Sequence, residues 1–269
     1  MHAPVRSRPT RAPARMFRFF LAVLLPVLAG PGAFARPLDV LFVGNSYVYV
    51  NNLPEVFRQV AAGAAQEAPR VVSHASGGQT LAGHGQDAAL LKKLEAPYDV
   101  VILQEQSQLP ALAETDRTAR QQFLEACTGL AGYIHQRQPA TRIILFQTWA
   151  RHRQAWQQAP GAGALGANPE EMQARLHRWY AEAARQCGAE VAPVGDLWRD
   201  NYRRAQPLML HASDGSHPAM AGTYLAALVL VSVVYAIPPT THDDGSLPPE
   251  TARQLRALVQ AHPGLGAAK

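Results

Sequence analysis

The sequence predicts a single α/β domain in which helices cover both faces of a five-stranded, mostly parallel sheet, a three-layer α/β/α architecture. Two observations support this prediction. Short apolar runs alternate with longer amphipathic runs along the chain, which is the order of a doubly wound sheet. The short runs are also continuously apolar rather than strictly alternating, as expected of parallel strands that are covered on both faces.

Five short runs are expected to form the strands. Each is rich in apolar residues and is bounded by Gly, Pro or polar turn residues, the composition of a buried strand. The expected strands cover residues 38–46, 70–76, 98–106, 141–150 and 189–198.

Longer runs with apolar residues at helical spacing are expected to form the helices. The segment 114–138 opens with acidic residues, 168–188 has Pro169 at its start, and 218–236 is apolar on most sides, which is typical of a buried helix. The full set is 53–66, 88–96, 114–138, 168–188, 218–236 and a short helix that starts near Pro249.

The first 35 residues have the pattern of a cleavable export signal. Arginines without any acid precede the apolar run FFLAVLLPVLAG, and Ala33 and Ala35 supply the small residues that a signal peptidase reads. The run is shorter than the roughly 20 residues that a membrane-spanning helix needs. We therefore expect a signal peptide over 1–35 and a periplasmic or secreted single domain over 36–269, without stable membrane insertion.

The excess of basic residues belongs to this leader. The chain has 25 Lys and Arg against 20 Asp and Glu, and the leader holds five arginines, so the rest of the chain is balanced. No cluster of Lys and Arg with interleaved aromatics remains, so we do not expect a nucleic-acid partner. About 234 residues follow the leader, which is enough for one well-buried domain and short for two.

Two cysteines, Cys127 and Cys187, would lie in an oxidising compartment, where a disulfide is permitted. Each falls inside an expected helix, where a small buried thiol is the commoner role, so the thiol is favoured while the bridge stays open. No group of His and Cys has the spacing of zinc ligands, so we expect no structural metal.

A candidate nucleophile lies at the end of the first expected strand. Ligands of open α/β sheets bind outside the carboxyl ends of the strands, and Ser46 in GNSY is placed there. Position alone favours a helix cap instead, since Asn and Ser are the residues that cap helices. The segment does not match the G-x-S-x-G nucleophile elbow, because Val48 stands where the second glycine should be.

Two more strand ends point to the same edge of the sheet. Gly77 and Gly78 follow the second strand and allow a ligand to approach free backbone N–H groups. LQEQS places Gln104, Glu105 and Gln106 at the end of the third strand. An amide side chain and an exposed backbone N–H are the groups that could stabilise an oxyanion during acyl transfer.

The segment DGSHP holds an acid and an imidazole three residues apart, just before the last long helix. This spacing lets Asp214 fold back on Nδ1 of His217, and a serine needs such an oriented base to attack an ester. The same residue types also form ordinary turns, so the pair has catalytic meaning only together with Ser46.

Together these motifs resemble the SGNH, or GDSL-like, hydrolase superfamily over most of the chain that follows the leader. The resemblance implies a flavodoxin-like fold with Ser46 as the nucleophile and with Asp214 and His217 as the D-x-x-H pair. It also implies an oxyanion hole that contains Gly78, with Gly77 as the alternative.

The third motif departs from the usual G-x-N-D of that superfamily. LQEQS is similar to the Q-G-E motif of the sialate O-acetylesterase branch, which implies Gln104 as the oxyanion donor, beside the N–H groups of Ser46 and Gly78. Gln106 remains the alternative donor. Asn45 replaces the usual Asp, from which we expect a structural more than a catalytic consequence. The set GNSY, LQEQS and DGSHP resembles an exported bacterial subgroup.

We therefore expect a secreted serine esterase that hydrolyses O-acyl esters, O-acetyl above all, through a Ser-His-Asp triad and an acyl-enzyme. The resemblance implies a small-molecule or glycan ester as the substrate and no cofactor. Two alternatives stay open, an acyltransferase and a non-hydrolytic glycan-binding protein of the cell envelope; the intact triad argues against the second. The sequence does not specify the oligomeric state.

Other residues receive weaker interpretations. His74 and His84 flank the glycine segment and are expected to be packing or surface residues. Trp149 could line a sugar-binding cleft or belong to the core. The Gly/Ala/Pro-rich segment 157–171 is expected to be a substrate flap or a tolerated insertion, and the segment 242–250 a turn.

Overall fold

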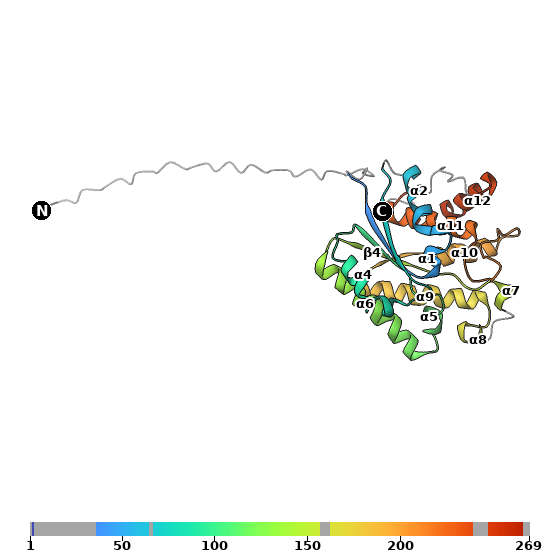
Figure 1. The fold of residues 1–269 in the computed structure, drawn as a ribbon, viewed down its shortest axis with the longest axis horizontal. Coiled ribbons are helices and arrows are strands. Elements are labelled where there is room, and N and C mark those ends of the chain that lie inside the picture. Colours follow the sequence, from blue (N-terminus) through green and yellow to red (C-terminus); the bar gives the residue numbers. More distant parts are fainter. Residues whose placement is uncertain (1, 3–35, 65–66, 157–161, 239–246, 266–269) are drawn as a thin grey trace. The chain divides into compact units, whose positions relative to one another are not determined.

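The sheet has the predicted architecture in the computed structural model, which describes residues 2, 36–64, 67–156, 162–238 and 247–265. Five parallel strands pair in the order β2-β1-β3-β4-β5, the flavodoxin-like order. Helices lie on either side of this sheet (Figure 1). They are β1 Asp39–Gly44, β2 Arg70–Ala75, β3 Val100–Leu103, β4 Arg142–Phe146 and β5 Glu190–Ala192. The expected signal peptide lies outside the described residues.

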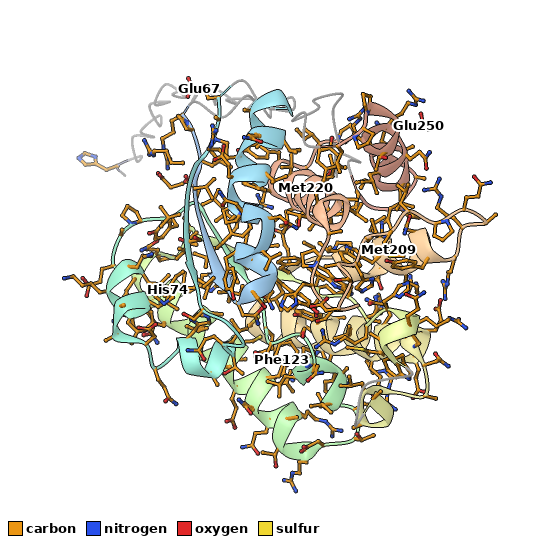
Figure 2. The ribbon with its side chains drawn as sticks, turned by 45° about the vertical axis from the view of Figure 1, so that its right-hand side comes forward. Glu67, His74, Phe123, Met209, Met220 and Glu250 are labelled. Atoms are coloured by element: carbon orange, nitrogen blue, oxygen red, sulfur yellow. The ribbon has the colours of Figure 1, made fainter. Side chains whose placement is uncertain are left out.

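Helices cover both faces of this sheet. One face carries α2 Leu53–Ala64, α10 Val194–Tyr202, α11 Met220–Tyr235 and α12 Pro249–Gln260. The other carries α3 Leu81–His84, α4 Ala88–Lys93, α5 Leu109–Leu112, α6 Arg117–Arg137 and α9 Pro169–Cys187. Figure 2 marks the two layers by Met220, at the start of α11, and Phe123, of α6.

The continuous apolar strands follow from this double cover. Successive side chains of a strand point to opposite faces, so Val40 and Phe42 of β1 enter one core and Leu41 and Val43 enter the other. All four side chains are fully buried. Burial of such a side chain contributes roughly 1.5–3 kcal/mol, so β1 anchors both cores and gives its carboxyl end a rigid base.

The last expected strand, 189–198, is wrong over its second half. β5 ends at Ala192, and α10 begins at Val194. Pro193 separates the two because it lacks the N–H that a strand ladder needs. Beyond it, Val194, Leu197 and Trp198 have helical spacing and are buried on one side of α10.

Several short helices were not predicted. The first is α1, Ser46–Tyr49, which is followed by the 3-10 turn Val50–Asn52. Another, α7, covers Arg153–Trp156. The segment 157–171 contains α8, Ala162–Leu165, and the start of α9, while 157–161 lie outside the described residues, as does most of the expected turn at 242–250.

Cys127 of α6 and Cys187 of α9 are both free thiols and both buried, which confirms the favoured interpretation from the sequence. Burial raises the pKa of the Cys127 thiol well above its ordinary value and also raises that of Cys187. The two sulfurs are therefore uncharged core groups. No helix within the described ranges combines the length and apolar composition needed to cross a bilayer.

Candidate active site

A chain of hydrogen bonds links Ser46, His217 and Asp214 at the carboxyl edge of the sheet. Nε2 of His217 lies 2.9 Å from Oγ of Ser46, and Nδ1 of the same ring lies 2.5 Å from Oδ2 of Asp214. Ser46 precedes Asp214 by 168 residues and His217 by 171 residues. The fold therefore assembles the constellation that the sequence predicts, with a base in reach of the hydroxyl and an acid on the other ring nitrogen.

The local geometry frees the Ser46 hydroxyl. Asn45 is the cap of α1, since its side-chain oxygen accepts from the N–H of Tyr47 at 3.2 Å, and Ser46 is the first residue of that helix. The helix cap that position alone favoured for Ser46 is thus supplied by its neighbour. Gly44 permits the close approach of the Gln104 side chain, because a Cβ there would lie 2.5 Å from Oε1 of Gln104.

The two side-chain hydrogen bonds of Asn45 require an amide at this position. Its Oδ1 accepts from the helix, while its Nδ2 donates to the carbonyl of Gln79 at 3.1 Å. A carboxylate could make the first bond but has no proton for the second. Asn45 is 3% exposed, so its role is structural: it connects the nucleophile turn to the segment that follows β2.

The acid and the base are held in one tight turn. Gly215 has a φ of 64°, a left-handed conformation that glycine adopts without strain. This bend lets Oδ1 of Asp214 accept from the backbone N–H groups of Ser216 and His217, both at 2.9 Å. Partial burial by itself would raise the pKa of Asp214, but the His217 ring and these two N–H groups together lower it to about 2. Asp214 is therefore ionised at neutral pH.

Aromatic rings pack against the turn that holds Asp214 and His217. The Trp149 ring lies parallel to those of Tyr47 and Trp198, with centroid distances of 4.4 and 3.8 Å, and its Nε1 donates to the carbonyl of Ser216. Trp149 is 1% exposed, so the sugar-cleft interpretation is wrong and the tryptophan is core. Tyr47 makes an edge contact with the His217 ring at 5.7 Å.

The glycine segment after β2 is an exposed turn beside the site. Gly78 has a φ of 70°, and the backbone N–H groups of Gly77 and Gly78 make no hydrogen bond within the described residues. The Ser46 N–H is also free of an intrahelical acceptor, because it lies in the first turn of α1. These amides are available donors, and the contacts do not choose between the two glycines.

Gln104 and Gln106 have different surroundings. Gln104 is fully buried, its Oε1 accepts from the N–H of Asn45 at 2.9 Å, and its Nε2 donates to the carbonyl of Glu105. Gln106 is only half-buried, and its Oε1 accepts from Gln108 and Leu109. Its amide nitrogen makes no hydrogen bond in the described part of the chain. Gln104 therefore positions the turn formed by Asn45 and Ser46, whereas the amide nitrogen of Gln106 is a free donor.

Glu105 is a site residue to which the sequence assigned no role. Its side chain is fully buried, and its Oε1 accepts from the N–H groups of Leu81 at 3.1 Å and Gln106 at 2.6 Å. Burial raises the pKa of Glu105 to about 7, although these two hydrogen bonds lower it. The carboxyl joins the end of β3 to the start of α3. An acid two residues after the apolar run that ends at Leu103 was the available signal.

Arg151 was also missed, because nothing in its local sequence distinguishes it. Its guanidinium donates to the Tyr47 hydroxyl at 2.9 Å and to the Ser107 hydroxyl at 3.3 Å. It also lines a cavity of about 300 Å³ together with His211 and other residues. Burial lowers the pKa of His211 to about 3, so its ring is neutral there. Arg151 thus places a positive charge between the nucleophile helix and this cavity.

His74 and His84 lie apart from the triad. His74 Nε2 is 2.7 Å from Oδ2 of Asp87, and His84 Nε2 is 2.8 Å from the carbonyl oxygen of Gly44. Neither ring makes a hydrogen bond to Ser46.

No family model and no curated protein matches the chain. Solved structures do match. A DUF4886 family protein from Bacteroides uniformis is 18% identical and superposes with a TM-score of 0.64 over 84% of this chain and 94% of its own. A candidate GDSL-like lipase from Parabacteroides merdae is 13% identical, with a TM-score of 0.53 over 83% and 97% of the two chains.

A candidate lipolytic protein of the G-D-S-L family from Desulfitobacterium hafniense is 15% identical, with a TM-score of 0.50 over 73% of this chain and 99% of its own. At these identities the likeness concerns the fold. The chain therefore has the three-layer α/β/α fold that is also found in GDSL-like proteins.

Proposed function

We propose that the protein is a serine ester hydrolase of the SGNH type. The observation that carries the proposal is the hydrogen-bonded series from Ser46 through His217 to Asp214, at the edge of the sheet where α/β proteins bind ligands. The GDSL-like fold supports it, since GDSL-like lipases are among the solved structures with this architecture.

The geometry supports a standard acyl-enzyme route. His217 removes the proton from the Ser46 hydroxyl as that oxygen attacks the ester carbonyl, and Asp214 stabilises the imidazolium that forms. Collapse of the tetrahedral intermediate expels the alcohol, which takes the proton from His217. Water, deprotonated by the same ring, then attacks the acyl carbonyl. The second tetrahedral intermediate releases the carboxylic acid, and Oγ of Ser46 takes its proton back from His217.

The oxyanion hole of this proposal contains the N–H groups of Ser46 and Gly78 and the amide of Gln106. The side-chain donor in this proposal is Gln106, not Gln104, which the sequence motif favoured. Gln104 would have to leave the Asn45 N–H and the Glu105 carbonyl to reach a substrate, whereas the Gln106 amide nitrogen is free. Preorganised donors of this kind stabilise the charge that develops on the carbonyl oxygen.

For the substrate, we propose a short O-acyl ester, acetyl above all, carried by a carbohydrate. The resemblance of LQEQS to the sialate O-acetylesterase motif supports the acetyl group. The Arg151 guanidinium, next to the Tyr47 and Ser107 hydroxyls, offers donors to a hydroxyl-rich alcohol. The export pattern of residues 1–35 supports a periplasmic or secreted enzyme, which fractionation of cells and N-terminal sequencing would test.

Hydrolysis of p-nitrophenyl esters of increasing acyl length tests the proposal. We expect turnover that is fastest for acetyl and absent in Ser46→Ala. A fluorophosphonate should add its mass to the wild-type chain and not to this variant. Parallel reactions with a sugar acceptor would reveal an acyltransferase by the appearance of acylated sugar. Turnover that persists in Ser46→Ala would refute the triad.

A further inference from the structure

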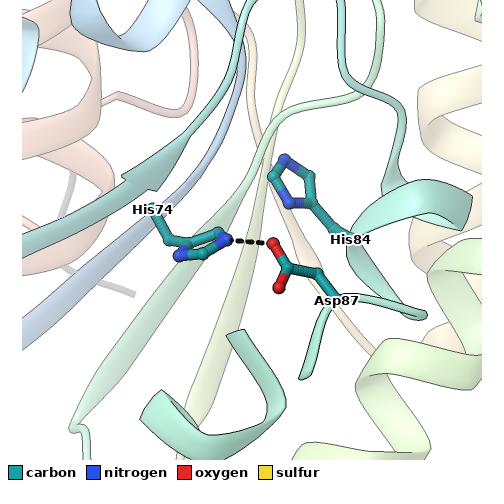
Figure 3. Close-up of side chains that lie close together, drawn as sticks. All are labelled: His74, His84 and Asp87. Carbon is teal, nitrogen blue, oxygen red and sulfur yellow. Dashed lines mark hydrogen bonds and ion pairs between the residues drawn. The ribbon is translucent and has the colours of Figure 1, made fainter. Parts of the chain in front are cut away.

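Three potential metal ligands converge next to the nucleophile turn. His74 comes from β2, His84 ends α3, and Asp87 caps α4. One ligand atom from each residue lies within 4.8 Å of the other two. Figure 3 shows the three side chains pointing toward one another. Among the described residues, these three form the one group with enough close His, Cys, Asp or Glu side chains to hold a metal ion, and none of them belongs to the triad.

The buried histidine is already prepared as a ligand. His84 is fully buried, and its Nε2 lies 2.8 Å from the Gly44 carbonyl oxygen, to which it must donate because a carbonyl can only accept. Its Nδ1 therefore carries the lone pair, and this nitrogen is buried without a hydrogen-bond partner. A metal-binding histidine has this arrangement, with one nitrogen held by a backbone carbonyl and the other free for the metal.

The other two ligands complete a site that an ion can reach. The side chain of His74 is 16% exposed and that of Asp87 is 32% exposed, so one side is open to solvent. In a tetrahedral zinc site with bonds of about 2.0–2.1 Å, neighbouring ligand atoms are about 3.3 Å apart. The present separations, from 2.7 Å between His74 and Asp87 up to 4.8 Å, bracket that value. Side-chain adjustments of about 1 Å would close the site.

We propose that His74 Nε2, His84 Nδ1 and Asp87 bind one Zn²⁺ ion, with water as the fourth ligand. Two imidazoles and a carboxylate are a donor set that zinc takes in proteins. The ion replaces the proton shared by His74 and Asp87 and occupies the lone pair of His84. The spacing of zinc ligands in sequence failed to indicate this site, because nine residues separate the two histidines and their rings meet only where the turn after β2 leads into α3.

The bound ion would cross-link two segments of the chain next to the carboxyl edge of the sheet. It joins edge strand β2 to the segment of α3 and α4, and the turn with Gly77 and Gly78 lies between these two attachments. His84 would also link the ion to Gly44, because its Nε2 donates to the Gly44 carbonyl. Gly44 lies one residue before Asn45, the cap of α1. Zinc binding is therefore expected to stabilise the fold on its own account, whether or not the chain hydrolyses esters.

Titration of the purified, tag-free chain with Zn²⁺ after treatment with EDTA tests the proposal without an activity assay. We expect one equivalent to bind, with a rise in Tm, and a Co²⁺ complex with the strong visible absorption of a four-coordinate ion. Asp87→Asn should weaken binding at least about 100-fold while keeping the α4 cap, because Asn also caps helices. His74→Gln should have the same effect and provides a second, independent variant.

His177→Gln is the matched control. His177 pairs with Asp196 at 2.7 Å, as His74 does with Asp87, but no third ligand is grouped with that pair in the described structure. This variant should bind Zn²⁺ as the wild type does. The proposal is overturned if the wild type binds no Zn²⁺ stoichiometrically, or if both Asp87→Asn and His74→Gln retain wild-type affinity.

Discussion

Two polar clusters lie at the carboxyl edge of this sheet, and they differ in exposure: the front cluster is open to solvent and the back cluster is buried. The front cluster is Ser46, Asp214 and His217, and the side chains of its base and acid are 37% and 48% exposed. The back cluster is Asn45, His84, Gln104 and Glu105, none of which is more than 3% exposed. Both contain the residue types of catalytic sites, but only the front cluster is accessible to solvent, as the proposed reaction requires.

The difference teaches that burial, not residue type, separates reacting groups from positioning groups. Each member of the back cluster contacts backbone: Gln104 and His84 reach the nucleophile turn, and Glu105 reaches the start of α3. Such bonds fix the geometry of the front cluster and stabilise buried polar atoms. Variants of the front cluster should therefore lower kcat without lowering stability, whereas back-cluster variants that remove a hydrogen bond should mainly lower stability.

The largest effect is expected for Ser46→Ala. Loss of the nucleophile should lower kcat for p-nitrophenyl acetate by at least about 10⁴-fold, because the acyl-enzyme can no longer form. The helix cap is supplied by Asn45, so thermal unfolding should shift Tm by less than about 4 °C. A large loss of Tm would show that the front cluster is also structural and would break the comparison.

Asp214→Asn should be the next most damaging change. The amide cannot hold the imidazolium and favours the wrong tautomer of His217, which corresponds to a loss in kcat of roughly 10⁴-fold in a triad. Steady-state kinetics at pH 7 measures it, with Asp200→Asn as a control at an acid that pairs with Arg199 and lies outside the triad. Near-normal turnover in Asp214→Asn would remove the acid from the mechanism.

The two glutamines compare front and back directly. Gln106→Ala should lower kcat by roughly 10²- to 10³-fold with little change in KM and little change in Tm, as expected for one oxyanion donor. Gln104→Ala should mainly lower Tm, since it leaves the buried Asn45 N–H and Glu105 carbonyl unpaired. If Gln104→Ala lowers kcat at unchanged Tm and Gln106→Ala does not, the donor is Gln104.

The smallest expected effect is a pH-dependent change in stability in Glu105→Gln. The carboxyl has a pKa of about 7 in the fold against 4.5 unfolded, so the folded state binds the extra proton and wild-type stability falls as pH rises between these values. The amide does not titrate and keeps an oxygen for Leu81 and Gln106. The variant should therefore gain up to about 3 kcal/mol relative to wild type between pH 4.5 and pH 8. Urea unfolding at the two pH values measures this difference, and parallel curves would refute it.

The sequence alone predicted the architecture, and it predicted that Ser46, Asp214 and His217 lie together. Apolar runs with strand-like length specify covered parallel strands wherever they occur, and β1, β3 and β4 formed where such runs predict them. The triad residues could be named because each follows a strand end or a turn, and strand ends share one edge of the sheet. The exceptions were β5, where a local feature, Pro193, ended the strand, and the edge strand β2, which formed as expected but has no fully buried residue.

Tertiary structure decided everything that depends on what covers a side chain. Gln104 and Gln106 lie two residues apart on the same side of the expected strand, and the sequence motif favoured Gln104 as the donor. In the structure Gln104 is buried against Gly44 and Asn45, whereas Gln106 is half-buried. Stacking between two rings placed Trp149 in the core. The physical reason is that periodicity and turn residues are local properties of the chain, whereas burial and hydrogen-bond partners arise only when distant segments meet.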